Sequence, residues 1–172
     1  LNYPLAAPSA NISTKISPVS KQDVKDEFGK KIKLVLEGGQ SKIGVESTIV
    51  SLINKPEVLR LGGIPKEQIK KYINSPLTYR KKSKVKTSGQ GKTHYSPYIK
   101  LRMNIKKAKK NEAFILIKKR KKMHKNYFYL SKNNNLKEAA KNLYKTLRFI
   151  KKKKFRSIAV EEIPNIEFVG VC

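Results

Sequence analysis

Residues 113–117 read Ala-Phe-Ile-Leu-Ile, a run that carries no polar side chain. Such a run is typical of a strand that is buried on both faces, which requires a sheet with layers on either side. Residues 99–103, 127–130 and 157–160 are further strand candidates. An amphipathic helix precedes the last of these strands, with its apolar stripe at Leu136, Ala139, Ala140, Leu143, Leu147 and Ile150. The order strand, strand, strand, helix, strand predicts a small α/β domain.

The first part of the chain holds a short helix over residues 19–29. Ser20 is a suitable N-cap, Asp23 follows it three residues later, and Gly29 suits the end of the last turn.

Strand candidates follow this helix. Residues 31–36 alternate lysine with an aliphatic residue, as a half-buried strand does, and residues 47–53 and 57–61 are rich in β-forming residues. Pro65 opens a second helix, whose apolar face is predicted at Ile69, Tyr72 and Ile73.

Residues 76–97 have the composition of a linker, with prolines, glycines, serines and a run of lysines but no apolar period. The chain therefore divides into residues 1–75, a linker at 76–97, and residues 98–172.

The positive charge is concentrated in the second part of the chain. The net charge is +28; residues 1–75 hold 12 Lys/Arg and 7 Asp/Glu, or +5, whereas residues 76–172 hold 28 and 5, or +23. A basic half indicates contact with RNA or another polyanion. Lysines number 34 and arginines 6. Base-reading sites favour arginine, which is scarce here. A coding bias toward AT-rich codons therefore explains the many lysines as well as an RNA-binding surface does.

The lone cysteine, Cys172, has no intrachain partner for a disulfide. No apolar run approaches the ~20 residues of a membrane span, and residues 1–11 lack the features of a signal peptide. These features predict a cytoplasmic protein without a membrane partner.

Three short blocks are poor in charge and rich in small polar groups. Residues 8–18 read Pro-Ser-Ala-Asn-Ile-Ser-Thr-Lys-Ile-Ser-Pro, residues 44–48 read Gly-Val-Glu-Ser-Thr, and residues 59–63 read Leu-Arg-Leu-Gly-Gly. Hydroxyl and amide groups suit hydrogen bonds to a polar ligand, and the prolines hold the backbone extended.

In this order and spacing, the three blocks resemble the YrdC-like threonylcarbamoyl-AMP synthases, over roughly residues 3–75. His94-Tyr95-Ser96-Pro97 is similar to the linker of the longer, two-domain members. The resemblance implies an α/β fold in which residues 1–75 are the C-terminal half of a YrdC-like twisted open-sheet domain. Residues 98–172 are then a small Rossmann-like accessory domain.

The resemblance also implies the reaction. L-Threonine, bicarbonate and ATP yield threonylcarbamoyl-adenylate and pyrophosphate, with Mg²⁺ carried by the nucleotide, and a downstream tRNA threonylcarbamoyl transferase uses the product. The step requires no protein nucleophile, so the protein positions its substrates and offsets the triphosphate charge.

The positions that match the family's sites form two sets. The set implied for ATP is Ser9, Asn11, Ser17, Arg60 and Tyr95, and the set implied for threonine is Ala7 and Ser47. Most of these positions have a structural alternative. The block around Asn11 is an Asx or Ser turn, and Ser47 is a strand residue that faces solvent. Arg60 is an arginine at a strand edge, and Tyr95 is a linker aromatic that anchors two domains. Glu46 orients a loop or ligand, or is a structural glutamate.

The chain also departs from the family pattern. Thr14 stands where the family has glycine, Val19 replaces threonine, Leu61 replaces proline, and residues 164–172 follow the closing segment only loosely. The family elements that precede Pro-Ser-Ala-Asn have no counterpart. We therefore expect a piece of a longer enzyme that is inactive and poorly stable by itself.

Two other functions share parts of this pattern. One is a basic YrdC-like module that binds RNA without catalysis. The other is carbamoyl transfer, which typically requires zinc-ligand cysteines. His94 and His124 are the only histidines and stand in unrelated contexts, so no metal-ligand cluster is predicted.

Overall fold

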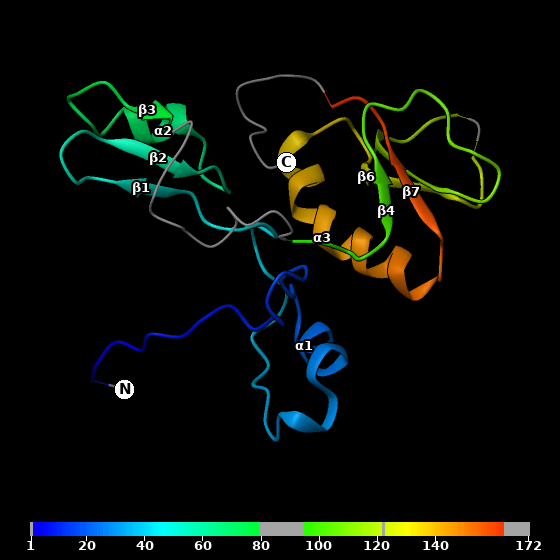
Figure 1. Ribbon diagram of the computed structural model, residues 1–172, viewed down its shortest axis with the longest axis horizontal. Coiled ribbons are helices and arrows are strands. Elements are labelled where there is room, and N and C mark those ends of the chain that lie inside the picture. The colour runs from blue at the N-terminus through cyan, green and yellow to red at the C-terminus, as the bar shows by residue number, and fades with distance from the viewer. Residues whose placement is uncertain (1, 80–94, 122, 164–172) are drawn as a thin grey trace.

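The computed structural model describes residues 2–79, 95–121 and 123–163 and has a mixed α/β fold (Figure 1). Its strands form a three-stranded sheet of order β1-β2-β3 and a four-stranded sheet of order β4-β7-β5-β6. The predicted α/β class is confirmed.

The four-stranded sheet is entirely parallel. Its strands are β4 (Lys100–Arg102), β5 (Ala113–Lys118), β6 (Tyr127–Ser131) and β7 (Ser157–Val160), and the helix α3 (Leu136–Lys152) connects β6 to β7. In the centre of the sheet, Ile115 pairs with Phe128 on one side and with Val160 on the other. All four strands and the helix that the sequence predicted in this part are confirmed.

The β5 strand is covered on both faces because alternate side chains enter two different clusters. Ile115 and Ile117 pack in the larger cluster with Leu147 and Ile150 of α3. Phe114 and Leu116 point the other way and form a smaller cluster with loop and strand residues, namely Ala159, Ile105, Ala108, Tyr127 and Tyr129. This arrangement accounts for the uninterrupted apolar run of β5.

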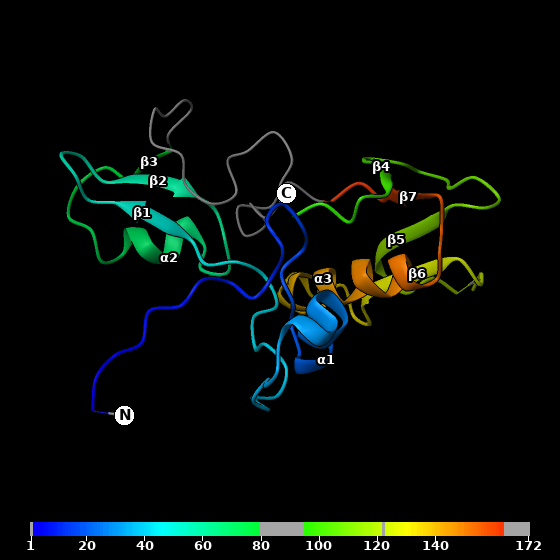
Figure 2. The same cartoon turned by 60° about the horizontal axis from the view of Figure 1, so that its bottom comes forward.

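The helix α1 (Lys21–Phe28) confirms the first predicted helix. The Ser20 hydroxyl accepts a hydrogen bond from the backbone N–H of Asp23 at 3.2 Å, and the Asp23 carboxylate accepts one from the N–H of Val19 at 3.1 Å. The first bond satisfies an N–H group that a helix start leaves unpaired, and the second fixes the residue before the N-cap. Gly29 ends the helix with φ of 53°. In both Figures 1 and 2, α1 lies beside α3.

The three-stranded sheet carries the third motif. Strand β1 (Ile49–Ser51) is antiparallel to β2 (Glu57–Arg60), and β2 is parallel to β3 (Thr78–Tyr79). The short helix α2 (Lys66–Lys70) follows Pro65 as predicted. The β3 strand and the buried Leu77 fall at the start of the predicted linker, so that stretch is not structureless. Residues 80–94 of the linker lie outside the described residues.

Two local predictions are wrong. Residues 31–36 form no strand: a turn of 3₁₀-helix, η1 (Gly29–Lys31), leads into irregular chain, where Leu34 and Leu36 are 76% and 80% exposed. A strand requires a hydrogen-bonded neighbour, and none of the described segments pairs with these residues. Tyr72 lies beyond the end of α2 and is 84% exposed, so it does not share a buried face with Ile69.

Candidate functional site

Arg60, at the end of β2, joins the second and third sequence motifs. Its Nε and Nη2 donate to the carbonyl oxygen of Ser47 at 3.0 and 2.9 Å, and Nη2 also lies 3.1 Å from the Ser47 hydroxyl. The antiparallel pairing of β1 with β2 produces this contact, because it sets Ile49 opposite Arg60. A two-pronged contact from one guanidinium fixes the Ser47 backbone more firmly than a single donor would.

Tyr95, near the end of the predicted linker, also contacts Arg60. Its hydroxyl accepts a hydrogen bond of 2.6 Å from Nη1 of Arg60. Its ring stacks against Tyr144 of α3 with centroids 5.9 Å apart. Burial, together with the charge of Glu46, raises the pKa of the Tyr95 phenol above its usual value of 10.0. The hydroxyl therefore stays protonated at neutral pH and retains its hydrogen.

Glu46 links the first motif to Arg60. The buried Ser17 hydroxyl donates to Oε1 of Glu46, while Oε2 lies 3.8 Å from Nη2 of Arg60. Ser17 also lies 3.4 Å from Oδ1 of Asn11, whose amide nitrogen donates to two backbone carbonyls of its own loop, Ile12 and Lys15. Asn11 thus shapes the loop, as the turn alternative predicts, while it also lies beside Ser17.

Two glycines allow the motifs to approach closely. A Cβ on Gly62 would lie 2.3 Å from the carbonyl oxygen of Glu46, and a Cβ on Gly44 would lie 2.2 Å from the carbonyl oxygen of Lys141 in α3. Gly44 also has φ of 80°, which favours glycine. The second motif is therefore held between β2 on one side and α3 on the other.

Thr14 stands in the left-handed region with φ of 73°. This is the position at which the family pattern has glycine, so the backbone keeps a glycine-like conformation although the residue has a branched side chain. Its hydroxyl contacts the hydroxyl of Tyr98, and its carbonyl accepts a hydrogen bond from Ser96 N–H at 2.9 Å.

A cavity of about 600 Å³ opens beside these groups. Ser9, Ser17 and Ser47 line it from the motifs, Tyr144 lines it from α3, and the irregular chain contributes Val35, Leu36, Gly38, Gly39, Gln40 and Ser41. A smaller cavity of about 310 Å³ lies next to it and also contacts Glu46 and Ser47. Asn11, Arg60 and Tyr95 do not line either of these two cavities. Ala7 is exposed and also lines neither of them.

Comparison with known families extends over nearly the whole chain. Residues 1–62 match the Sua5/YciO/YrdC family model, described as telomere recombination. Residues 64–170 match the C-terminal domain of threonylcarbamoyl-AMP synthase. This chain belongs to the threonylcarbamoyl-AMP synthase family. The resemblance that the three motifs predicted is confirmed.

Individual proteins that resemble this chain carry the name of the same family. Threonylcarbamoyl-AMP synthase of Pyrococcus abyssi is 45% identical over 100 residues, which cover 55% of this chain and 29% of the relative. The Schizosaccharomyces pombe enzyme is 40% identical over 109 residues, covering 57% and 27%. The crystal structure of P. abyssi Sua5 complexed with L-threonine matches with a TM-score of 0.73 and 30% identity, over 91% of this chain and 52% of that one. The chain thus spans about half the length of this solved relative, and its aligned part covers under a third of each curated one.

Some of the residues around the cavity were not predicted from the sequence. Tyr144 was missed because it lies among the lysines of a helix far along the chain, and no local pattern connects it to the motifs. Gly44 and Gly62 belong to the second and third motifs. Glycine at such a position is a general signal of close backbone approach, but the sequence does not say which segment approaches.

Within residues 2–79, 95–121 and 123–163, no group of three or more His, Cys, Asp or Glu side chains is placed to hold a metal ion. None of the helices described is both long and apolar enough to cross a membrane. His94 and Cys172, noted from the sequence, fall outside the described residues, as does the closing segment 164–172.

Proposed function

We propose that the protein acts as an L-threonylcarbamoyladenylate synthase, a nucleotidyltransferase that serves threonylcarbamoyladenosine formation in tRNA. The substrates are L-threonine, bicarbonate and ATP, the last with its Mg²⁺. The products are threonylcarbamoyl-AMP and pyrophosphate, and a tRNA threonylcarbamoyl transferase uses the adenylate.

The chemistry balances without a group on the protein that forms a covalent bond. The threonine amine adds to carbon dioxide from bicarbonate and loses a proton, which gives a carbamate. A carbamate oxygen then attacks the α-phosphorus of ATP, and pyrophosphate leaves. The protein has to hold three polar reactants together and stabilise the charge on the phosphates.

The observation that carries the proposal is the convergence of all three motifs on Arg60. Ser47 contacts Arg60 directly, Ser17 reaches it through Glu46, and Tyr95 bonds to it from the end of the linker. A guanidinium is the side chain best suited to phosphate oxygens. The two cavities that meet at Glu46 and Ser47 support adjacent places for the nucleotide and the amino acid.

The proposed residue roles are those that the family resemblance implies. Ser9, Asn11, Ser17, Arg60 and Tyr95 are proposed to serve the nucleotide, and Ala7 and Ser47 are proposed to serve threonine. The support for Ser9, Ser17 and Ser47 is that they line the larger cavity. Ala7 has no such support, because it is exposed and lines neither cavity.

The test is isotope exchange between ATP and pyrophosphate, made with the complete protein as its gene encodes it. Exchange should require both L-threonine and bicarbonate, and ¹³C from bicarbonate should enter the adenylate product. Exchange that persists without threonine and bicarbonate would contradict the proposal. Exchange that requires threonine but incorporates no ¹³C would identify an ordinary aminoacyl-adenylate reaction instead.

The basic second part supports a second candidate, weak contact with tRNA or another RNA. The +23 charge carried by residues 76–172 is its basis. If the lysines release counterions from RNA, the logarithm of the binding constant falls linearly with the logarithm of salt concentration, with a slope of about −0.7 per phosphate contacted on a single strand. A slope near zero would leave the lysines without an RNA role, and RNA binding in a protein that lacks exchange activity would favour the non-catalytic module.

A further inference from the structure

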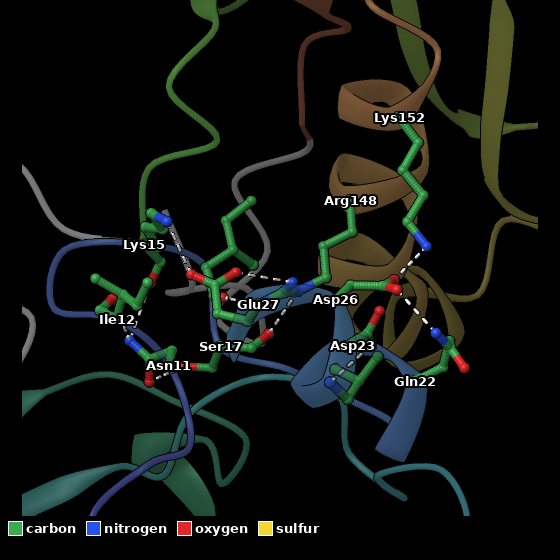
Figure 3. A network of polar contacts seen from close by, with 12 residues as sticks. Asn11, Ile12, Lys15, Ser17, Gln22, Asp23, Asp26, Glu27, Arg148 and Lys152 are labelled. Atoms are coloured by element: carbon green, nitrogen blue, oxygen red, sulfur yellow. Dashed lines mark hydrogen bonds and ion pairs between the residues drawn. The ribbon is translucent and has the colours of Figure 1, made fainter. Parts of the chain in front are cut away.

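One stripe of α3 faces the first part of the chain. Tyr144, Arg148 and Lys152 recur every four residues and therefore share one side of the helix. Tyr144 lines the larger cavity, and Lys152 forms an ion pair with Asp26 of α1. Figure 3 shows Arg148 and Lys152 extending from α3 toward α1 and toward the segment that holds Asn11 and Ser17.

Arg148, the middle residue of this stripe, contacts the backbone of the first motif. Its Nη2 donates to the carbonyl oxygen of Ile16, and its Nε lies 3.4 Å from the carbonyl oxygen of Ser17. Its Nη1 lies 3.4 Å from Oε2 of Glu27 on α1. The Arg148 and Glu27 side chains are 12% and 8% exposed, so this cluster is largely shielded from water.

The two carbonyl bonds act on the peptide units that flank Ser17. Pro18 follows Ser17, so the segment has one backbone N–H fewer with which to fix itself. Ile16 and Val19, on either side, are buried in the same apolar cluster as Leu147 of α3. With the backbone anchored to α3 on one side, the Ser17 hydroxyl points to Glu46, which contacts Arg60.

We propose that Arg148 is a positioning residue for the candidate nucleotide site: from α3 it holds the backbone at Ile16 and Ser17 so that Ser17 faces Glu46 and the cavity. The second part of the chain thereby sets the geometry of a site whose motifs lie in the first part. The assignment of ATP as the ligand rests on the proposed function, whereas the effect on the order of residues 9–17 does not.

A guanidinium is required for this role rather than a positive charge alone. Two carbonyl oxygens and one carboxylate oxygen are contacted through three different nitrogens of Arg148. The single ammonium of Arg148→Lys cannot reproduce that fork. Glu27 also pairs with Lys15, whose Nζ lies 3.2 Å from Oε1 of Glu27, so the charges have to be exchanged in a Lys15→Met background. If Arg148 only fastened α3 to α1 through Glu27, Arg148→Glu with Glu27→Arg in that background would restore function. If the carbonyl contacts matter, swapping the charges cannot restore function, because the carboxylate of Arg148→Glu donates no hydrogen bond to the two carbonyl oxygens.

The experiment compares Arg148→Lys, Arg148→Met and the charge-exchanged variant, the last against its Lys15→Met parent, with Lys145→Met as the control, all in the complete protein. Lys145 directly follows Tyr144 in α3, is exposed, and carries the same charge as Arg148, which makes it a matched control. Three quantities are measured: amide hydrogen exchange over residues 9–17, the dissociation constants for ATP and L-threonine, and the unfolding midpoint.

Arg148→Lys and Arg148→Met should speed hydrogen exchange in residues 9–17. They should also weaken ATP binding about tenfold, the effect of losing one charge-assisted hydrogen bond, with threonine binding changed less than about twofold. The charge exchange should leave both defects in place, and Lys145→Met should show neither. Rescue by the charge exchange, or an Arg148→Lys protein with unchanged hydrogen exchange, would overturn the proposal. Faster hydrogen exchange in a protein that never binds ATP would instead contradict the proposed function and leave the positioning role intact.

Discussion

Nη1 of Arg60 donates a hydrogen bond of 2.6 Å to the hydroxyl of Tyr95, although 35 residues separate them. One residue ends a strand of the first sheet, and the other stands just before the second. The bond therefore connects the two parts of the chain at the point where three motifs meet.

Replacing Tyr95 with phenylalanine should remove this bond while it preserves the stacking on Tyr144. A hydrogen bond from a charged donor contributes about 1.5–3 kcal/mol. Because the pair is only partly buried, we expect the free energy of unfolding to fall by about 1 kcal/mol. Urea titration of the complete protein measures it. Tyr72→Phe, on an 84% exposed ring, is the control and should change nothing; equal effects would show that the Arg60 bond contributes no stability.

Gly62→Ala should disturb the site by direct collision. The added Cβ would meet the carbonyl oxygen of Glu46 at 2.3 Å, and overpacking of this kind costs about 1–3 kcal/mol. The unfolding midpoint and ATP affinity should both fall. Gly38→Ala is the matched control for the unfolding midpoint, since a Cβ there would have no heavy atom within 4 Å. If the two variants behave alike, the close approach at Gly62 is not a constraint.

Thr14→Gly should stabilise the protein, because a branched residue with φ of 73° bears a strain of about 1–2 kcal/mol that glycine does not. The comparison is best made in a Tyr98→Phe background, which already lacks the hydroxyl contact with Thr14. Ser13→Gly, at the preceding residue, whose φ is not positive, should destabilise through unfolded-state entropy. A loss of stability with Thr14→Gly would mean that the left-handed conformation is not costly here.

Arg60→Ala and Ser47→Ala should separate the two substrates. Loss of the guanidinium should weaken ATP binding more than threonine binding, since it removes the positive charge. Loss of the Ser47 hydroxyl should weaken threonine binding more. Isothermal titration with each ligand gives both constants. Parallel losses for both ligands in both variants would indicate that the two residues are structural.

Glu112 should give the second part of the chain an acid-sensitive stability. The pKa of Glu112 is lowered from 4.5 to about 2, and the largest cause is the pair of hydrogen bonds that its carboxylate accepts from Arg102. Because the folded-state pKa is depressed, the stabilisation is complete above the unfolded-state value near 4.5 and is lost as pH falls toward 2. Glu112→Gln should lower stability at pH 7 by about 1–3 kcal/mol and reduce its decline over that pH window. Urea midpoints between pH 7 and pH 2 test this; an unchanged acid limb would contradict it.

Local patterns predicted most of the secondary structure. The apolar run 113–117, the stripe of α3 and the Ser20 cap each correspond to an observed element, because burial on one or two faces and capping are read from neighbouring residues. The strand predicted at 31–36 failed because alternation signals a strand only when another strand lies beside it. The sequence of those six residues does not show whether a neighbouring strand is present to pair with them.

For this protein, the sequence alone determined the elements of the second sheet, the family and the motif residues, since each depends on residue types at short spacing. Only the tertiary structure decided which of these meet. It placed Arg60 between Ser47 and Tyr95, turned Ser17 toward Glu46, and left Ala7 exposed and outside the lining of both cavities. It also brought Arg148 to the carbonyls of residues more than 130 positions earlier. Such contacts depend on the packing of α3 against the first motif through Ile16 and Val19, and side-chain packing between distant segments leaves no periodic trace along the chain.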